Sequence, residues 1–167
     1  MTRGVVFVHS APSALCPHVE WAVAGVLGMR VNLAWTAQPA APGAWRTEVS
    51  WQGRPGTGSR LASALRACRV LRFEVTEEPS AAGEGERYSF TPSLGLFAAT
   101  TASNGDVLVS EHRLRAAVES ARAEVAAGAA AVLDAVDRLL GSPWDDELET
   151  FRHAGDGAPV RWLHQVG

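Results

Sequence analysis

The first half of the chain alternates between apolar and polar positions in several short segments, which predicts a β-rich fold. The first segment, Val5-Val6-Phe7-Val8, is apolar at every position, so side chains on both of its faces need cover. We therefore expect it to be a central strand. The later segments alternate cleanly, as half-buried antiparallel strands do. The strands predicted in this half are residues 4–10, 31–38, 44–52 and 69–76.

Two segments between these strands carry apolar residues at helical spacing. A stripe that runs from Leu15 to Val26 repeats every three to four residues, and Gly28 supplies the stop. Residues 59–67 repeat in the same way and predict a second, shorter helix. The resulting order, β-α-β-β-α-β, is the ferredoxin-like arrangement.

The second half of the chain predicts further strands and a long helix. Three strands are expected at residues 87–91, 94–101 and 106–109, and an Asn104-Gly105 turn joins the last two. Residues 111–140 carry a nearly heptad apolar seam and predict one long helix. Packing of this helix across the sheet is the first interpretation, and self-pairing in a dimer is the second.

The predicted fold is α+β, in a single domain of residues 1–167. Its antiparallel sheet starts with a ferredoxin-like βαββαβ unit, is extended by further strands, and carries the long helix of residues 111–140. A short helix after Ser142 and a last edge strand at residues 160–165 complete the prediction.

Charge and composition exclude several classes of function. The net charge is −3 and no block of basic residues is present, which argues against nucleic-acid binding. All 15 basic residues are arginine, so lysine catalysis and a Walker A phosphate loop are impossible. No segment is apolar for long enough to span a bilayer, and the start of the chain has no signal-peptide pattern. Two cysteines make no disulfide framework, so we expect a cytoplasmic protein with reduced thiols and with no metal or cofactor.

The junction between the first strand and the first helix holds the candidate catalytic residues His9, Cys16 and His18. A thiol at a helix N-terminus can have a lowered pKa, because the helix dipole favours the thiolate. At ~100° per residue, however, Cys16 and His18 point roughly 200° apart on a helix, so they do not form a nucleophile–base pair or bind one metal ion. His9 remains able to meet one of them from the end of the strand. A packed, structural role is the favoured interpretation of this junction.

A glycine-rich loop provides the candidate ligand-binding residues. Glycines at the start of a helix allow backbone N–H groups to face an anion, and two flanking arginines would add donors for phosphate. The spacing matches neither the dinucleotide fingerprint nor a P-loop, and an ordinary tight turn is the more frequent meaning of such a pattern. The residues concerned are Arg54, Gly56, Thr57, Gly58, Ser59 and Arg60.

Tryptophan positions add one further expectation. Trp35, Trp45 and Trp51 lie on the predicted apolar faces of strands, so we expect them to be buried. Trp21 falls nearly opposite the apolar stripe of its helix, where it either touches a second layer or marks an interface.

Four segments stand out together: Val8-His9-Ser10-Ala11-Pro12-Ser13, Cys16-Pro17-His18-Val19-Glu20-Trp21, Gly56-Thr57-Gly58-Ser59-Arg60-Leu61 and Glu86-Arg87-Tyr88-Ser89-Phe90-Thr91-Pro92. Together they resemble an uncharacterised actinobacterial family, the domain of unknown function 3145. Since this family has no assigned activity, the resemblance implies no catalytic residue. It implies a link to fatty-acid synthesis, and with it an acyl carrier protein or a CoA-type ligand as partner.

The leading hypothesis is a non-catalytic cytoplasmic module that binds a protein partner or a phosphate-bearing metabolite. One alternative is a small enzyme that uses Cys16 or His9 at the first strand–helix junction. Another is a structural dimer module that pairs through the long helix.

Overall fold

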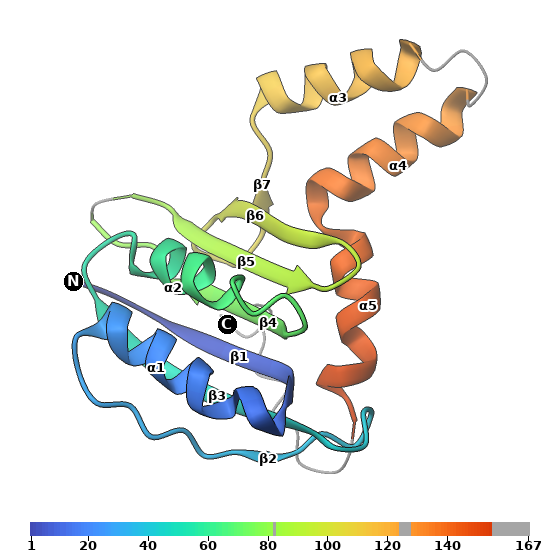
Figure 1. The fold of residues 1–167 in the computed structure, drawn as a ribbon. Helices are drawn as coiled ribbons and strands as arrows, with labels where there is room; N and C mark the ends of the chain where they lie inside the picture. Colours follow the sequence, from blue (N-terminus) through green and yellow to red (C-terminus); the bar gives the residue numbers. More distant parts are fainter. Residues whose placement is uncertain (82, 124–127, 155–167) are drawn as a thin grey trace.

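Seven strands form one antiparallel sheet in the computed structural model, which describes residues 1–81, 83–123 and 128–154 (Figure 1). Their order across the sheet is β2-β3-β1-β4-β5-β6-β7. The mixed α+β class and the extension of the sheet beyond four strands are confirmed. The strands are β1 (Thr2–Pro12), β2 (Thr36–Ala37), β3 (Ala44–Gly53), β4 (Arg72–Glu77), β5 (Gly85–Thr91), β6 (Gly95–Thr101) and β7 (Val107–Leu108).

Six helical segments accompany the sheet in this part of the chain. Figure 1 shows α1 and α2 side by side on one face of the sheet, and α3 and α4 as a hairpin that stands away from it. The predicted edge strand at residues 160–165 lies outside the described residues. The helical segments are η1 (Ser13–Leu15), α1 (Cys16–Leu27), α2 (Thr57–Leu65), α3 (Glu111–Ala123), α4 (Gly128–Leu140) and α5 (Ser142–Arg152).

Strand β1 is central, as its unbroken apolar run predicts. It pairs with β3 on one side and with β4 on the other, and both partners are antiparallel to it. Val6 and Val8 face the two helices α1 and α2, while Phe7 and His9 face the opposite side. All four side chains are buried, which explains why the run contains no exposed polar position.

The main core lies between the sheet and the α1–α2 layer. Val19 of α1, Leu61 of α2 and Phe73 of β4 are all fully buried there. Burying a side chain of this size contributes about 1.5–3 kcal/mol, so this layer supplies most of the hydrophobic stabilisation. Trp51 is buried in the same core, as predicted.

Helix α5 packs on the opposite face of the sheet, against β1 and β5. The Trp144 ring lies 5.2 Å from the Phe97 ring, and its indole N–H donates to the carbonyl of Gly95 at 2.9 Å. Leu148, one turn later, is fully buried. Gly141 begins the helix with a positive φ of 87°, and a Cβ atom there would lie 2.6 Å from the Phe97 ring, so the approach of α5 to the sheet requires a glycine.

The prediction of one long helix over residues 111–140, packed on the sheet, is wrong. Helix α3 ends at Ala123 and α4 begins at Gly128, and the two helices pack against each other. Ala121 and Ala131 are buried in this pair, because small residues let two helices approach closely. The apolar seam therefore closes on its own chain, and α5 is the helix that covers this face of the sheet.

The predicted strand at residues 31–38 is also mostly wrong. Only Thr36–Ala37 pairs with β3, and the preceding residues follow α1 instead. The Glu20 carboxylate of α1 accepts hydrogen bonds from the backbone N–H of Leu33 at 3.1 Å and from the indole N–H of Trp35 at 3.0 Å. The alternation in this segment therefore reflects contact with a helix and not pairing with a strand.

Two other predictions from the strand patterns have opposite outcomes. Trp45, expected in the core, is 37% exposed; it lies near the start of β3, where it pairs with Ala37 of the edge strand β2. The Asn104-Gly105 turn does join β6 to β7. Gly105 has a φ of 87°, and the Asn104 side chain accepts from the N–H of Asp106 at 3.1 Å.

Candidate functional site

A buried ionic cluster lies beneath α5, and we call it the Glu74 cluster. It comprises His9 of β1, Glu74 of β4, Arg87 of β5, and Asp145 and Arg152 of α5. The Glu74 side chain is completely buried, with its Oε2 atom 2.6 Å from Nε2 of His9. Arg152 donates to both of its oxygens, at 3.0 and 2.6 Å, and Arg87 donates to Oε1 at 3.2 Å. Sequence analysis singled out only His9 of these five residues.

Strand register brings these residues together. Glu74 lies opposite Phe7 on β1 and opposite Ser89 on β5, so its side chain projects from the face that α5 covers. Asp145 and Arg152 are two helical turns apart and share one side of α5. Asp145 accepts from Arg152 at 2.6 Å and also from Arg87, which closes the cluster.

Electrostatic effects hold the cluster in its charged form. Burial by itself would raise the pKa of Glu74, but hydrogen bonds and charge from His9 and Arg152 hold that pKa well below its ordinary value. Burial would lower the pKa of Arg152, whereas Glu74 and Asp145 raise it above its ordinary value. Two arginines thus balance two carboxylates, and the cluster ties α5 to the sheet. Buried ion pairs of this kind add geometric specificity more than net stability.

The chemical capacity of the Glu74 cluster is limited by its burial. The His9 side chain is 8% exposed, and its Nε2 atom is engaged by Glu74. A general base must be able to accept a proton from a substrate. The Nε2 atom of His9 is not available for this, because Glu74 occupies it. In the described part of the chain, Nε of Arg87 is a buried donor with no hydrogen-bond partner. The arrangement therefore suits a structural anchor better than an acid–base site.

The other candidate catalytic residues do not join His9. Cys16 begins α1 and packs against the core on the helix side of the sheet, whereas His9 faces α5 on the opposite side. Among the described residues the thiol contacts the carbonyl oxygen of Pro12 at 3.8 Å, and no hydrogen bond joins it to His9 or His18. Burial and the negative charge of Glu20 raise the pKa of the Cys16 thiol, which disfavours the thiolate.

His18 and Trp21 form an exposed pair on the outer side of α1. Their rings meet edge to face, with centroids 5.1 Å apart. Trp21 is 67% exposed. The expected contact with a second layer is therefore not found within the described chain. His18 therefore lies at the surface and not in a catalytic constellation.

The glycine-rich loop precedes α2, and the N-terminus of that helix already binds a carboxylate of the same chain. Gly56 precedes α2 with a φ of 82°, and the N–H groups of Gly56 and Gly58 donate to the two oxygens of Glu77, at 2.8 and 2.7 Å. A Cβ atom on Gly58 would lie 3.0 Å from that carboxylate, so a side chain there would crowd the contact. Glu77 was not expected from the sequence, because it is the last residue of β4 and only the fold brings it to the start of α2.

The rest of this candidate site divides between core and surface. Thr57 is buried and accepts from the Arg60 guanidinium at 3.1 Å. Arg54, Ser59 and Arg60 are exposed. The anion position that the pattern predicts is filled by the carboxylate of Glu77, and only these exposed groups are left to meet a ligand from outside.

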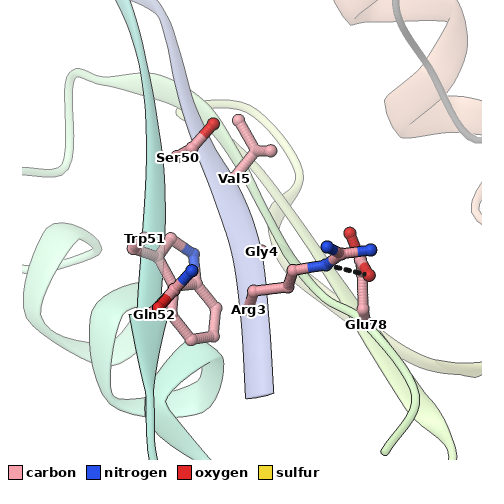
Figure 2. Close-up of a pocket in the computed structure, with 7 residues that line it drawn as sticks. All are labelled: Arg3, Gly4, Val5, Ser50, Trp51, Gln52 and Glu78. Carbon is pink, nitrogen blue, oxygen red and sulfur yellow. Dashed lines mark hydrogen bonds and ion pairs between the residues drawn. The ribbon is translucent and has the colours of Figure 1, made fainter. Parts of the chain in front are cut away.

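A shallow hollow of about 510 Å³ opens at the start of β1 (Figure 2). Arg3 and Glu78 form an ion pair of 2.6 Å across one side of it, and both side chains are largely exposed. Because these two charges satisfy each other, the hollow presents no unbalanced charge to select a ligand. Its lining consists of Arg3, Gly4, Val5, Ser50, Trp51, Gln52 and Glu78.

In the described second half of the chain, the α3–α4 hairpin carries three of the four exposed leucines, and the fourth, Leu108, lies on β7. Leu114, Leu133 and Leu140 are 42%, 65% and 41% exposed. A second hollow, of about 270 Å³, runs along α3, and we call it the α3 groove. Leucines on an element that stands away from the core mark a contact surface more than a catalytic one. The α3 groove is lined by Leu114, Arg115, Val118, Glu119 and Arg122.

Within residues 1–81, 83–123 and 128–154, no group of three or more potential ligand side chains gathers for a metal ion. None of the helices in the same ranges has the length and apolar character needed to cross a bilayer.

Comparisons with known proteins identify the family and no activity. Neither the curated proteins nor the solved structures contain a match to this chain. A family model described as "Protein of unknown function (DUF3145)" matches residues 5–165. Since this match covers almost the whole sequence, the chain belongs to that family of unknown function.

Proposed function

We propose that this chain is a non-catalytic module that binds a protein partner through its α3–α4 hairpin. The observation that carries the proposal is the exposure of Leu114, Leu133 and Leu140 on a pair of helices that stand away from the sheet (Figure 1). Single exposed leucines are common on monomeric proteins, but three on one projecting pair of helices concentrate exposed apolar surface on one element. Covering them with a partner removes apolar surface from water.

The apolar positions of α4 are too widely spread for a helix that contacts only α3. Ala131 is buried, whereas Leu133 lies about 200° around the helix from it. Val132, Val136 and Leu139 occupy the arc between these two positions and are half-buried. A helix that faces one neighbour needs an apolar stripe of only roughly 100°. The arc from Ala131 to Leu133 is about twice as wide, so about half of it is available for another contact.

The enzyme alternative has less support. It needs a thiolate at Cys16 or an accessible imidazole at His9, but the pKa of the thiol is raised and the imidazole is held by Glu74. The phosphate-ligand alternative needs the backbone N–H groups of Gly56 and Gly58, which already bind Glu77. Binding of a protein partner through the hairpin requires no rearrangement of Cys16 and His9 or of the glycine-rich loop.

Our expectations about the start of the fold, the source organism, the cellular location and the ligand of this chain also belong to the proposal. The strand order β2-β3-β1-β4 supports a ferredoxin-like start for the fold, because that arrangement places its first strand between its third and fourth. The arginine-only basic composition favours an actinobacterial source. A cytoplasmic location, a link to fatty-acid synthesis, and an acyl carrier protein or CoA-type ligand stay predictions.

Photo-crosslinking inside cells tests the proposal. A photoreactive phenylalanine analogue at position 133 should yield a discrete crosslinked product, and the same analogue at the exposed position 36 of β2 should not. Adding Leu140→Arg should reduce the product from position 133 at least fivefold, because Leu140 is exposed on the same side of α4. Equal yields at the two positions, or no product at either, would refute a contact through the hairpin.

A further inference from the structure

We propose that the outer face of the α1–α2 layer is a second binding surface, which takes an acidic segment of a protein partner. This surface is separate from the α3–α4 hairpin, so it can bind whether or not the hairpin has a partner. We call it the basic face, and its residues are His18 and Trp21 of α1, Arg60 and Ser63 of α2, and Arg66 directly after α2.

Helical geometry points the residues of the basic face away from the sheet. On α1, Trp21 lies at ~200° from the fully buried Val19, and on α2, Ser63 lies at ~200° from the fully buried Leu61. The arginines three residues before and three residues after Ser63 lie about 60° to either side of it. Because the two helices pack side by side on one face of the sheet (Figure 1), their outward sides form one surface.

The exposed side chains of this layer carry positive charge and no negative charge. Residues 16–30 and 54–71 contain both helices and their flanking turns, and no acidic residue among them is exposed. Five exposed arginines lie in the same ranges, and none of them forms an ion pair within the described chain. These five are Arg30, Arg54, Arg60, Arg66 and Arg69.

The carboxylates in and next to this layer lie deeper than the arginines and do not cancel their charge. Glu20 is half-buried and accepts from a backbone and an indole N–H, while Glu77 is buried and accepts from two backbone N–H groups. Glu86 of β5 is half-buried and accepts from the Tyr88 hydroxyl. Counting all three against the five arginines still leaves a net charge of +2, with the positive groups outermost.

Trp21 supplies the apolar part of the basic face. Its ring is 67% exposed, and Met29 and Val70, in the turns that follow the two helices, are exposed as well. Aromatic residues, Met and Arg are the types that protein–protein interfaces favour over the rest of the surface. A small phosphate-bearing ligand needs a concave site, and both hollows described above lie elsewhere on the molecule.

The distribution of charge along the chain favours a short acidic segment over an extended anionic surface. Residues 74–167 contain 16 of the 18 acidic side chains, and the whole chain has a net charge of −3. A membrane or a nucleic acid would also meet this acidic part, and charges repel over a Debye length of about 8 Å at physiological salt. A protein segment that contacts the basic face alone avoids this repulsion.

Fluorescence anisotropy with the purified full chain tests the proposal. The probe is a labelled helical peptide of about 20 residues with glutamates on one side and leucines on the other, and the control probe has glutamine in place of every glutamate. The acidic peptide should bind at least tenfold more tightly than the glutamine peptide at about 50 mM salt. Raising the salt to about 300 mM should weaken its binding at least fivefold, because ions screen exposed charges.

Two pairs of substitutions locate the binding surface. Arg60→Ser/Arg66→Ser should weaken binding of the acidic peptide at least tenfold, and Trp21→Ser at least threefold, because each removes part of the basic face. The matched control is Arg113→Ser/Arg138→Ser, which removes two exposed arginines from α3 and α4 and should change binding less than twofold. Circular dichroism checks that each variant remains folded.

Three results would overturn the proposal. The first is no binding of the acidic peptide up to about 500 μM, and the second is an equal loss of binding in the two arginine pairs. The third is tighter binding of duplex DNA or of anionic vesicles through Arg60 and Arg66, which would assign the basic face to an extended polyanion. None of these results bears on crosslinking from position 133, so the function proposed for the hairpin is tested separately.

Discussion

Replacing Glu74 by glutamine removes the central negative charge of the Glu74 cluster while preserving the volume of the side chain. The glutamate is fully buried and is contacted by His9, Arg87 and Arg152. After the substitution, two arginines that are 7% and 10% exposed share the carboxylate of Asp145, whose side chain is 35% exposed. Uncompensated positive charge in a protein interior is costly, so the change should destabilise the fold.

The size of the loss in unfolding free energy depends on which ion pairs remain after the substitution. Removing one partner of a buried ion pair costs about 3–5 kcal/mol. Arg152 retains its 2.6 Å contact with Asp145, which places Glu74→Gln at the lower end, about 3 kcal/mol. With a denaturant slope of about 1–3 kcal/mol per molar urea, the unfolding midpoint should fall by roughly 1–3 M.

The pH dependence gives an independent check of the same reasoning. The pKa of Glu74 is lower in the folded state than in the unfolded chain, whose ordinary value is about 4.3. The carboxylate therefore stabilises the fold fully above about pH 5, and this contribution is lost as the pH falls through 4 toward the folded-state pKa. The difference in unfolding free energy between wild type and Glu74→Gln should be constant from pH 7 to 5 and should shrink below pH 4.

Urea denaturation, followed by tryptophan fluorescence and far-UV circular dichroism, measures both quantities. Glu149→Gln is the matched control, because Glu149 contacts Arg152 at 3.5 Å from a side chain that is 58% exposed. Exposed pairs contribute at most about 1 kcal/mol, so this variant should be nearly neutral. If Glu74→Gln costs no more than Glu149→Gln, or if its effect does not change with pH, the cluster does not anchor α5 as we argue.

Three further predictions concern other parts of the fold. Glu77→Ala should cost about 1–2 kcal/mol in unfolding free energy, because the first N–H groups of α2 lose their acceptor; an unchanged urea midpoint would contradict this. Gly4→Ala should cost at least about 3 kcal/mol, because its Cβ atom would lie 1.8 Å from the carbonyl oxygen of Thr76, whereas Gly25→Ala in α1 meets no atom within 4 Å and should leave thermal stability equal or higher. Iodoacetamide labelling of Cys16, followed by mass spectrometry, should accelerate at a higher pH than labelling of a thiol in an unfolded peptide, and a midpoint at a lower pH than that of the peptide would show that the thiol is activated after all.

Hydrophobic periodicity predicted the elements whose burial depends on their own side chains. The apolar run around Val6 and Phe7 became the central strand β1, and the stripe that ends at Gly28 became α1. The Asn104-Gly105 turn formed between β6 and β7, because its backbone conformation is a property of those two residues. In each case the deciding interaction is local or depends only on which face is apolar.

Periodicity failed where it could not distinguish between alternative neighbours. Residues 31–35 alternate like a strand, but Glu20 holds them along α1, so the same pattern serves a helix contact. Residues 111–140 repeat like one long helix, but the seam pairs α3 with α4. An apolar stripe shows that a face is covered and does not show what covers it.

The candidate sites show the same limit more sharply. The glycine loop before α2 was correctly recognised as a group of N–H donors, yet the anion that fills it is Glu77, from the far end of a strand. His9 was recognised as a notable residue, but its partner Glu74 lies 65 residues away and Arg152 lies a further 78 residues beyond Glu74. Carboxylates and arginines are frequent in any sequence, so no local signal marks the few that meet.

Local chemistry alone was therefore enough to establish the α+β class, the central strand, several helices and turns, and the absence of lysine chemistry. The folded arrangement was needed to pair Glu74 with its arginines, to fill the glycine loop, to place Cys16 and His9 on opposite faces, and to turn one seam into a projecting hairpin. The reason is that periodicity is a property of neighbouring residues, whereas charge pairing and burial depend on strand register and helix placement, which are set by the whole chain at once.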